Sequence, residues 1–221
     1  MSVQVAGSDG TIIGVDGTTF RAQRVVPKPI EFGAFGHYRL ADTVALVVTQ
    51  AANGTLFSFR WGDATRFCVL QKLRLELLQT SAATATIMPS YQVFIARSFS
   101  ASDSAGSALT LTGNSFKKRT TGMGTTLVTD IRKSTVAAGL TAGTRTLDAN
   151  PIMELTTNST ITTPNAIAYR KELEMDAGDG IHPYVFAQNE GFIVRGPTVV
   201  FGAAGTANLL VDVAWAEVSA Y

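Results

Sequence analysis

The stretch LFSFRWGDATRFCVLQKLRLELL, residues 56–78, decides the fold. In its first half Phe57, Phe59 and Trp61 alternate with the polar residues Ser58 and Arg60. Successive side chains of a β-strand point to opposite faces, so this period of two predicts a half-buried strand.

After a turn at Gly62 and Asp63, the second half of the stretch shows the same alternation of apolar and polar residues. Leu73, Leu75 and Leu77 alternate there with charged residues of both signs. This pattern predicts a second strand with one apolar face and one solvated face. No residue type in the stretch stands out as suited to catalysis, so we interpret it as scaffold.

Composition predicts a large β domain that takes part in an assembly. A chain of 221 residues can bury a sizeable core without disulfide or metal support. Hydrophobic residues make up 46% and charged residues only 16%. Charge is depleted at the core of protein interfaces, so we expect a homo-oligomer, with a trimer as one option. The formal net charge of +1 argues against general nucleic-acid binding, which needs clustered cations.

The cysteine count and the N-terminal sequence narrow the possible classes of protein further. One cysteine, Cys68, excludes an internal disulfide and a cysteine zinc cage, and we expect a small buried hydrophobe there. Residues 1–17 lack the basic start and apolar core of a secretory signal, so we expect folding in a cytoplasm. No stretch supplies the ~20 apolar residues of a membrane helix.

Residues 1–30 differ in character from the rest. The pairs Asp9-Gly10 and Asp16-Gly17 punctuate short β-prone pieces, and Pro27 and Pro29 enforce an extended path. We therefore predict an extended N-terminal arm, followed by one β-sandwich domain over residues 31–221.

Further strands are predicted along this domain. Alternation and turn residues indicate strands near residues 41–49, 56–61, 67–80, 91–99, 108–112, 169–175, 182–187, 191–195 and 209–216. About eight core strands without alternating helices predict an all-β, antiparallel, jelly-roll-like sandwich. The Cys and Trp hallmarks of a seven-strand immunoglobulin sandwich are missing.

Residues 113–164 are predicted to be a hairpin-bearing insertion or a long crossover. The hairpin turn would lie at Ala142 and Gly143, between Leu140 and Leu147. A short helix over residues 127–134 is the alternative, which periodicity does not decide.

Few residues carry a chemical signal. Lys117, Lys118 and Arg119 form the one local charge cluster, which we interpret as a solvated loop, with contact to a polyanion or a protein partner as the alternative. Arg132, Lys133 and Arg145 lie in the same section and would extend such a surface.

Catalytic and metal patterns are weak. His37 and His182 lack the spacing of a zinc motif, and we expect structural roles for both. Glu172 and Glu174 share a strand face at a spacing that a glycosidase could use, but neighbouring charges favour a solvated face. Residues 176–180, DAGDG, offer too few carboxylates for an EF-hand and predict a tight turn. We therefore predict no enzyme, cofactor or metal.

Three short motifs carry a resemblance to a known group. They are GHYR at 36–39, FSFRW at 57–61 and IARSF at 95–99, followed by LTGN at 111–114, LTAGTRTL at 140–147 and NEGF at 189–192. With these pieces the chain resembles a group of structural proteins of tailed-bacteriophage virions, from about Phe20 to the end.

The resemblance implies a structural component of the virion, assembled in the host cytoplasm. Within that class we expect a capsid-associated decoration or minor capsid subunit. Its implied partners are copies of itself and other virion proteins such as the major capsid protein, with no membrane. A tail, neck or fibre-anchoring subunit is the second reading. A glycan- or receptor-binding module is a third, with Trp61, Tyr91 and Tyr184 as candidate aromatics.

Overall fold

The computed structural model describes residues 4–6, 12–14, 34–47, 50–83, 87–118, 121–128, 130–135, 139–158, 168–174, 182–198 and 205–219. The chain divides into two units, Met1–Phe32 and Gly33–Tyr221. In the first unit, strands β1 (Gln4–Ala6) and β2 (Ile12–Gly14) pair antiparallel. The role of residues 1–30 as an arm stays a prediction.

The second unit is built from β-strands throughout its described part. They are β3 (Ala34–Val47), β4 (Thr55–Arg60), β5 (Phe67–Ser81), β6 (Ser90–Phe99), β7 (Ser104–Ala105), β8 (Ser107–Ala108), β9 (Asp130–Lys133), β10 (Leu140–Thr141), β11 (Arg145–Leu147), β12 (Met153–Thr156), β13 (Ala168–Glu174), β14 (Val185–Phe186), β15 (Gly191–Arg195) and β16 (Thr206–Val218).

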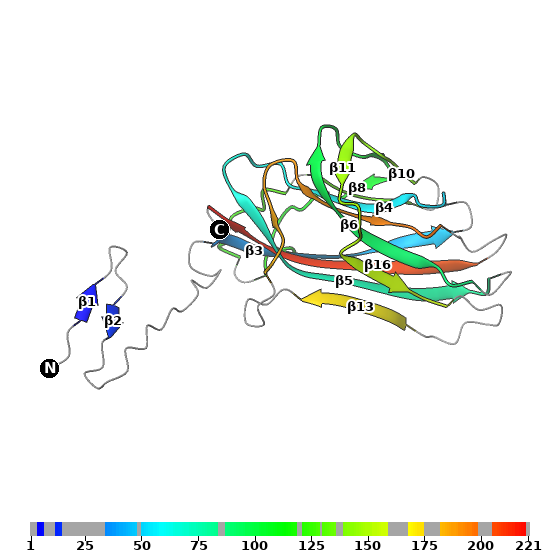
Figure 1. Cartoon of the computed structure of the whole chain (residues 1–221), viewed down its shortest axis with the longest axis horizontal. Coiled ribbons are helices and arrows are strands. Elements are labelled where there is room, and N and C mark those ends of the chain that lie inside the picture. The colour runs from blue at the N-terminus through cyan, green and yellow to red at the C-terminus, as the bar shows by residue number, and fades with distance from the viewer. Residues whose placement is uncertain are drawn as a thin grey trace. The chain divides into compact units, whose positions relative to one another are not determined.

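Two antiparallel sheets lie face to face (Figure 1). The small sheet has the order β13-β5-β16-β3, with β14 beside β5. The large sheet has the order β11-β6-β15-β4-β10-β7, with β12 beside β6, β9 beside β4 and β8 beside β9. These pairings confirm the predicted all-β antiparallel sandwich.

The predicted alternation of apolar and polar residues determines which side chains form the core. Phe57, Phe59 and Trp61 of the β4 stretch are fully buried. Leu73 and Leu75 of β5 are fully buried too, whereas the alternating charged residues Lys72, Arg74 and Glu76 are half-buried on the opposite face. Side chains of both sheets belong to one hydrophobic cluster.

An aromatic group joins the two sheets at its centre. The ring of Phe59 stacks on the ring of Phe192 in the large sheet, with 5.2 Å between the ring centroids. Its centroid lies 5.4 Å from that of Trp215 in β16, which it meets edge-on, and 6.3 Å from that of Phe186 in β14. Edge-on and offset arrangements of this kind add attraction beyond the area that they bury.

Several element predictions need correction. Strand β3 begins at Ala34, seven residues before the expected start, and no strand covers residues 109–112. In the predicted strand over residues 182–187 only β14 forms. The predicted turn at residues 176–180 lies outside the described residues.

The middle section differs most from expectation. Strands β10 and β11 form no hairpin, because β10 pairs with β4 and β7 while β11 pairs with β6. Strand β9 takes the place of the alternative helix. Its period of two explains this, since Ile131 enters the core while Asp130 and Arg132 face outward.

Cys68 is fully buried and unpaired, as expected. Burial in the core raises the pKa of its thiol well above the usual value, and the nearby Glu217 carboxylate adds to the rise. Cys68 therefore behaves as a small hydrophobic residue.

A strap formed by residues 116–118 and 121–128 is fastened to β3 and β16. The Lys118 amide donates to the His37 carbonyl at 2.8 Å, and the Tyr38 hydroxyl donates to the Gly124 carbonyl at 2.9 Å. Burial raises the pKa of Tyr38 to about 12. Residues 116–118 of the strap thus pair through the backbone with β3, which is the edge strand of the small sheet.

A buried carboxylate holds the far end of the strap. Glu217, 1% exposed, accepts hydrogen bonds from the Thr126 hydroxyl at 2.6 Å, the Leu127 amide at 2.9 Å and the Trp215 indole at 3.4 Å. Burial raises its pKa above the ordinary 4.5, although these donors oppose the rise.

Truncation of the central ring tests the core. Phe59→Ala should lower the free energy of unfolding by about 3–5 kcal/mol, because it removes the ring that both sheets contact. Urea unfolding followed by fluorescence measures the change, and the exposed-site variant Thr112→Ala provides the control. A loss below ~1 kcal/mol would show that the ring does not organise the core.

Glu217 predicts a pH dependence with a defined sign. The folded state holds the proton more tightly than the unfolded state, so this contribution to stability is complete below pH ~4.5 and is lost as the pH rises through the folded pKa. Glu217→Gln should remove this slope, whereas Glu76→Gln should retain it. Unfolding midpoints between pH 4 and pH 8 provide the measurement, and identical slopes in all three proteins would contradict the assignment.

Candidate functional site

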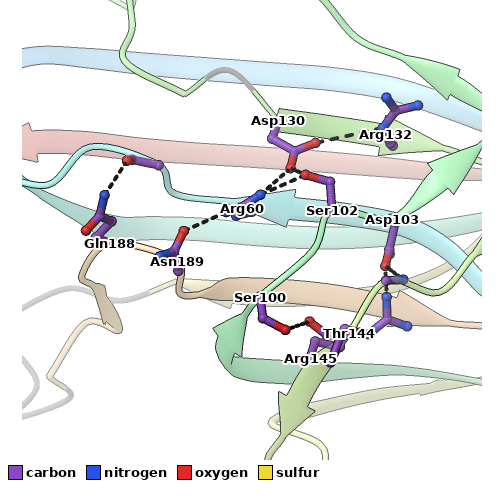
Figure 2. Close-up of polar contacts among 12 residues, drawn as sticks. Arg60, Ser100, Ser102, Asp103, Asp130, Arg132, Thr144, Arg145, Gln188 and Asn189 are labelled. Atoms are coloured by element: carbon purple, nitrogen blue, oxygen red, sulfur yellow. Dashed lines mark hydrogen bonds and ion pairs between the residues drawn. The ribbon is translucent and has the colours of Figure 1, made fainter.

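A group of polar contacts lies on the outer face of the large sheet, where part of the insertion crosses it (Figure 2). Arg60 ends β4, and because Phe59 points into the core, the Arg60 side chain points away from it. Arg60 Nη1 donates to Ser102 Oγ at 2.7 Å, and Nη2 donates to Asn189 Oδ1 at 2.6 Å.

Asp130 completes this first group. It lies opposite Arg60 in the β4–β9 register, and its Oδ2 is 3.4 Å from Arg60 Nη1. The hydroxyl of Ser102 donates to the same Oδ2 at 2.5 Å. Arg132 lies 3.8 Å from the other carboxylate oxygen. Strands β4 and β9, the loop after β6 and the turn before β15 thus meet at one guanidinium.

A buried ion pair forms the second group. The Asp103 side chain is fully buried, and its Oδ1 accepts from Arg145 Nη1 and from the Gly143 amide, the latter at 2.8 Å. Arg145 Nη2 donates to Thr55 Oγ1, at the start of β4, at 2.6 Å. Gly143 is required, because a Cβ atom there would collide with the backbone oxygens of the loop that precedes Asp103.

The crossing segments also cover an apolar cluster. Phe94, Ala96, Phe99 and Ile193 are buried on the large sheet in a cluster separate from the main core, and Leu147 of β11 packs against it. Phe94 lies between core-facing Val93 and Ile95 in β6, so the cluster belongs to the outer face. The two polar groups therefore fasten the insertion over this apolar surface.

The chemistry of the two groups is that of cross-links. Serine nucleophiles are activated by an imidazole base, whereas the Ser102 hydroxyl donates to a carboxylate that already faces a guanidinium. Arginine is suited to holding a carboxylate because its planar fork presents several donors. We assign both groups a structural role.

The predicted basic cluster lies in the strap. Lys117 Nζ donates to the Thr121 carbonyl at 2.8 Å, Lys118 is exposed, and Arg119 lies outside the described residues. The exposed Arg39 is brought beside them, because its amide donates to the Phe116 carbonyl at 2.9 Å. Sequence reasoning missed Arg39, since only tertiary pairing joins it to the cluster.

The other cations of the insertion do not extend this surface. Arg132, Lys133 and Arg145 each face a carboxylate, on Asp130, Asp42 and Asp103 respectively. Lys133 Nζ lies 2.7 Å from Asp42 and so links β9 to β3 across the edges of the two sheets.

The remaining candidates are dispersed. His37 is buried, with Nδ1 3.3 Å from Gln71 Oε1, and His182 is exposed. Glu172 lies 2.7 Å from Lys72 and contacts Arg170, as expected of a charged outer face. The side chain of Glu174 lies outside the described residues.

The described residues contain no group of three or more His, Cys, Asp or Glu side chains able to hold a metal ion. One open hollow of about 130 Å³ is lined by Met88, Pro89, Ser90, Gln92, Gly196, Pro197 and Thr198. Pockets for small molecules usually measure ~300–1,000 Å³, so the hollow is too small for one.

The aromatic side chains suggested for glycan binding are not exposed on the surface of the sandwich. Trp61 and Tyr91 are buried in the core, and Tyr184 is half-buried beside it. The described residues also form no helix that is long and apolar enough to cross a membrane.

Comparison with protein-family models and with curated proteins finds no match to this chain.

Comparing a buried with an exposed Asp–Arg pair tests whether the Asp103–Arg145 pair holds the insertion in place. Asp103→Asn leaves Arg145 buried without its counter-ion, which typically costs about 3–5 kcal/mol. The exposed pair of Asp148 and Arg97, at 2.8 Å, serves as the matched control, and Asp148→Asn should cost less than ~1 kcal/mol. Chemical unfolding of both variants gives the two values, and equal losses would refute the role of the Asp103 pair.

Proposed function

We propose that this chain is a bacteriophage virion structural protein, namely a capsid-associated decoration or minor capsid subunit that stabilises the shell through oligomeric contacts. The proposal rests on the sequence resemblance and on the strand order of the second unit. The strand order is the observation that carries the proposal. It also explains why the polar groups described above are used for fastening.

The strand order supports a jelly roll. Eight of the strands form two sets of four, β13-β5-β16-β3 and β12-β6-β15-β4, while β9, which is as long as β12, pairs with β4 at the other edge of the second set. Along the chain, these eight strands change sheet at every step except between β6 and β12, where the insertion intervenes. Two interleaved Greek keys of this kind make a double-sheet jelly roll, an architecture used by viral capsid domains.

Low charge supports a subunit role as well. Only 16% of the residues are charged, whereas soluble monomers usually display a denser charged surface. A tail, neck or fibre-anchoring subunit would share this composition. The number of copies in a particle separates the two positions, because shells contain many more subunits than tails.

Quantitative mass spectrometry of purified particles is the test. The number of copies should be in the hundreds, relative to the major capsid protein as internal standard. A handful to a few dozen copies would support the neck, tail or fibre position instead. Absence from washed particles would overturn the virion assignment altogether.

A further inference from the structure

Backbone pairing between the strap and β3 gathers three cations at one edge of the small sheet. The Arg39 amide donates to the strap at 2.9 Å, and the Lys118 amide donates back to β3 at 2.8 Å. Between these two hydrogen bonds Lys117 lies opposite Tyr38. Arg39 and Lys118 are therefore diagonal neighbours, at a separation of about 7–8 Å that long side chains can span. We call Arg39, Lys117 and Lys118 the basic surface.

The charged groups of the basic surface can be reached from outside. Arg39 follows Tyr38, which points into the core, so the Arg39 side chain points to the outer face, where it is exposed. Lys118 is exposed as well. The half-buried Lys117 donates its Nζ to the Thr121 carbonyl at 2.8 Å, and this neutral acceptor leaves the positive charge of the ammonium group in place.

These three residues differ from most other cations in the described part of the second unit. The following Lys and Arg side chains each form an ion pair with a carboxylate: Arg60, Lys72, Arg74, Arg97, Arg132, Lys133, Arg145 and Arg170. The basic surface forms no ion pair with a described residue. Glu217 beneath the strap is 1% exposed and already accepts three hydrogen bonds. The basic surface is thus a local excess of positive charge in a chain whose net charge is only +1.

Carboxylates limit the extent of the basic surface. Ala214 of β16 lies beside Arg39, and Lys72 of β5 lies on the other side of Ala214. Lys72 is 2.7 Å from Glu172 and 3.8 Å from Asp212, so the sheet beyond Ala214 is not basic. A nucleic-acid backbone needs many clustered cations and would meet these carboxylates. A short acidic segment of a protein needs only a few cations.

We propose that the basic surface binds an acidic segment of another protein in the particle. Complementary charge of this kind guides the encounter of two proteins and fixes how they are aligned. The inference deepens the proposed function, on which it rests for the location of the partner, by stating the chemistry that the partner presents.

A defined acidic probe tests the surface. Fluorescence anisotropy of a labelled octaglutamate peptide with the full-length protein, at about 20 mM salt where screening is weak, gives the dissociation constant. Arg39→Gln/Lys118→Gln removes two charges of the basic surface. The matched control Arg97→Gln/Arg170→Gln removes two charges from exposed arginines that already face a carboxylate.

The first double variant should bind the peptide about 10-fold more weakly than the wild type, because each exposed charge contact contributes a factor of roughly three. The control should stay within a factor of about two of the wild type. Should the first variant lose its circular dichroism spectrum, Lys118→Gln alone decides in its place.

A wild type that does not bind the peptide, or an equal loss in both double variants, overturns the inference. Tighter binding of a single-stranded DNA of the same charge overturns it too, because the surface would then be assigned to nucleic acid. These measurements use the isolated protein, whereas the number of copies is measured in particles, so the two proposals fail separately.

Discussion

The contact of Phe59 with Phe192 and Trp215 is the one on which the rest of the sandwich depends. It joins β4 and β15 of the large sheet to β16 of the small sheet. Because strand side chains alternate, burying this row of aromatics directs Arg60 and its outward-facing neighbours to the other face. The small sheet repeats the arrangement, with leucines inside and a network of Lys72, Glu172 and Asp212 outside. Both outer faces are thus consequences of the same inner contact.

The two outer faces are then used differently. The outer face of the small sheet carries charges that pair with one another, as on a solvated surface. The outer face of the large sheet carries Phe94 and Ile193, which need a cover, and the insertion supplies it. A buried pair such as Asp103 with Arg145 offers little net stability compared with apolar residues of equal volume, but it is costly to break. Such a pair penalises any placement of the insertion that would separate Asp103 from Arg145.

Periodicity alone predicted β4, β5, β6 and β15 to within one residue at each end, because a strand buried on one face must show its period of two in the residues themselves. It also found β16, but with a start three residues late and an end two residues early. The position of Cys68 between Phe67 and Val69 predicted its burial. The false hairpin at Ala142 has a physical reason: its turn residues were recognised, but the partners of β10 and β11 are set by a crossing over the large sheet. Asp103 and Arg145 lie 42 residues apart, so no local pattern could join them. The charge of Arg39 is written in the sequence, yet only the pairing of β3 with the strap decides that it lies beside Lys117 and Lys118, because that pairing joins segments far apart along the chain.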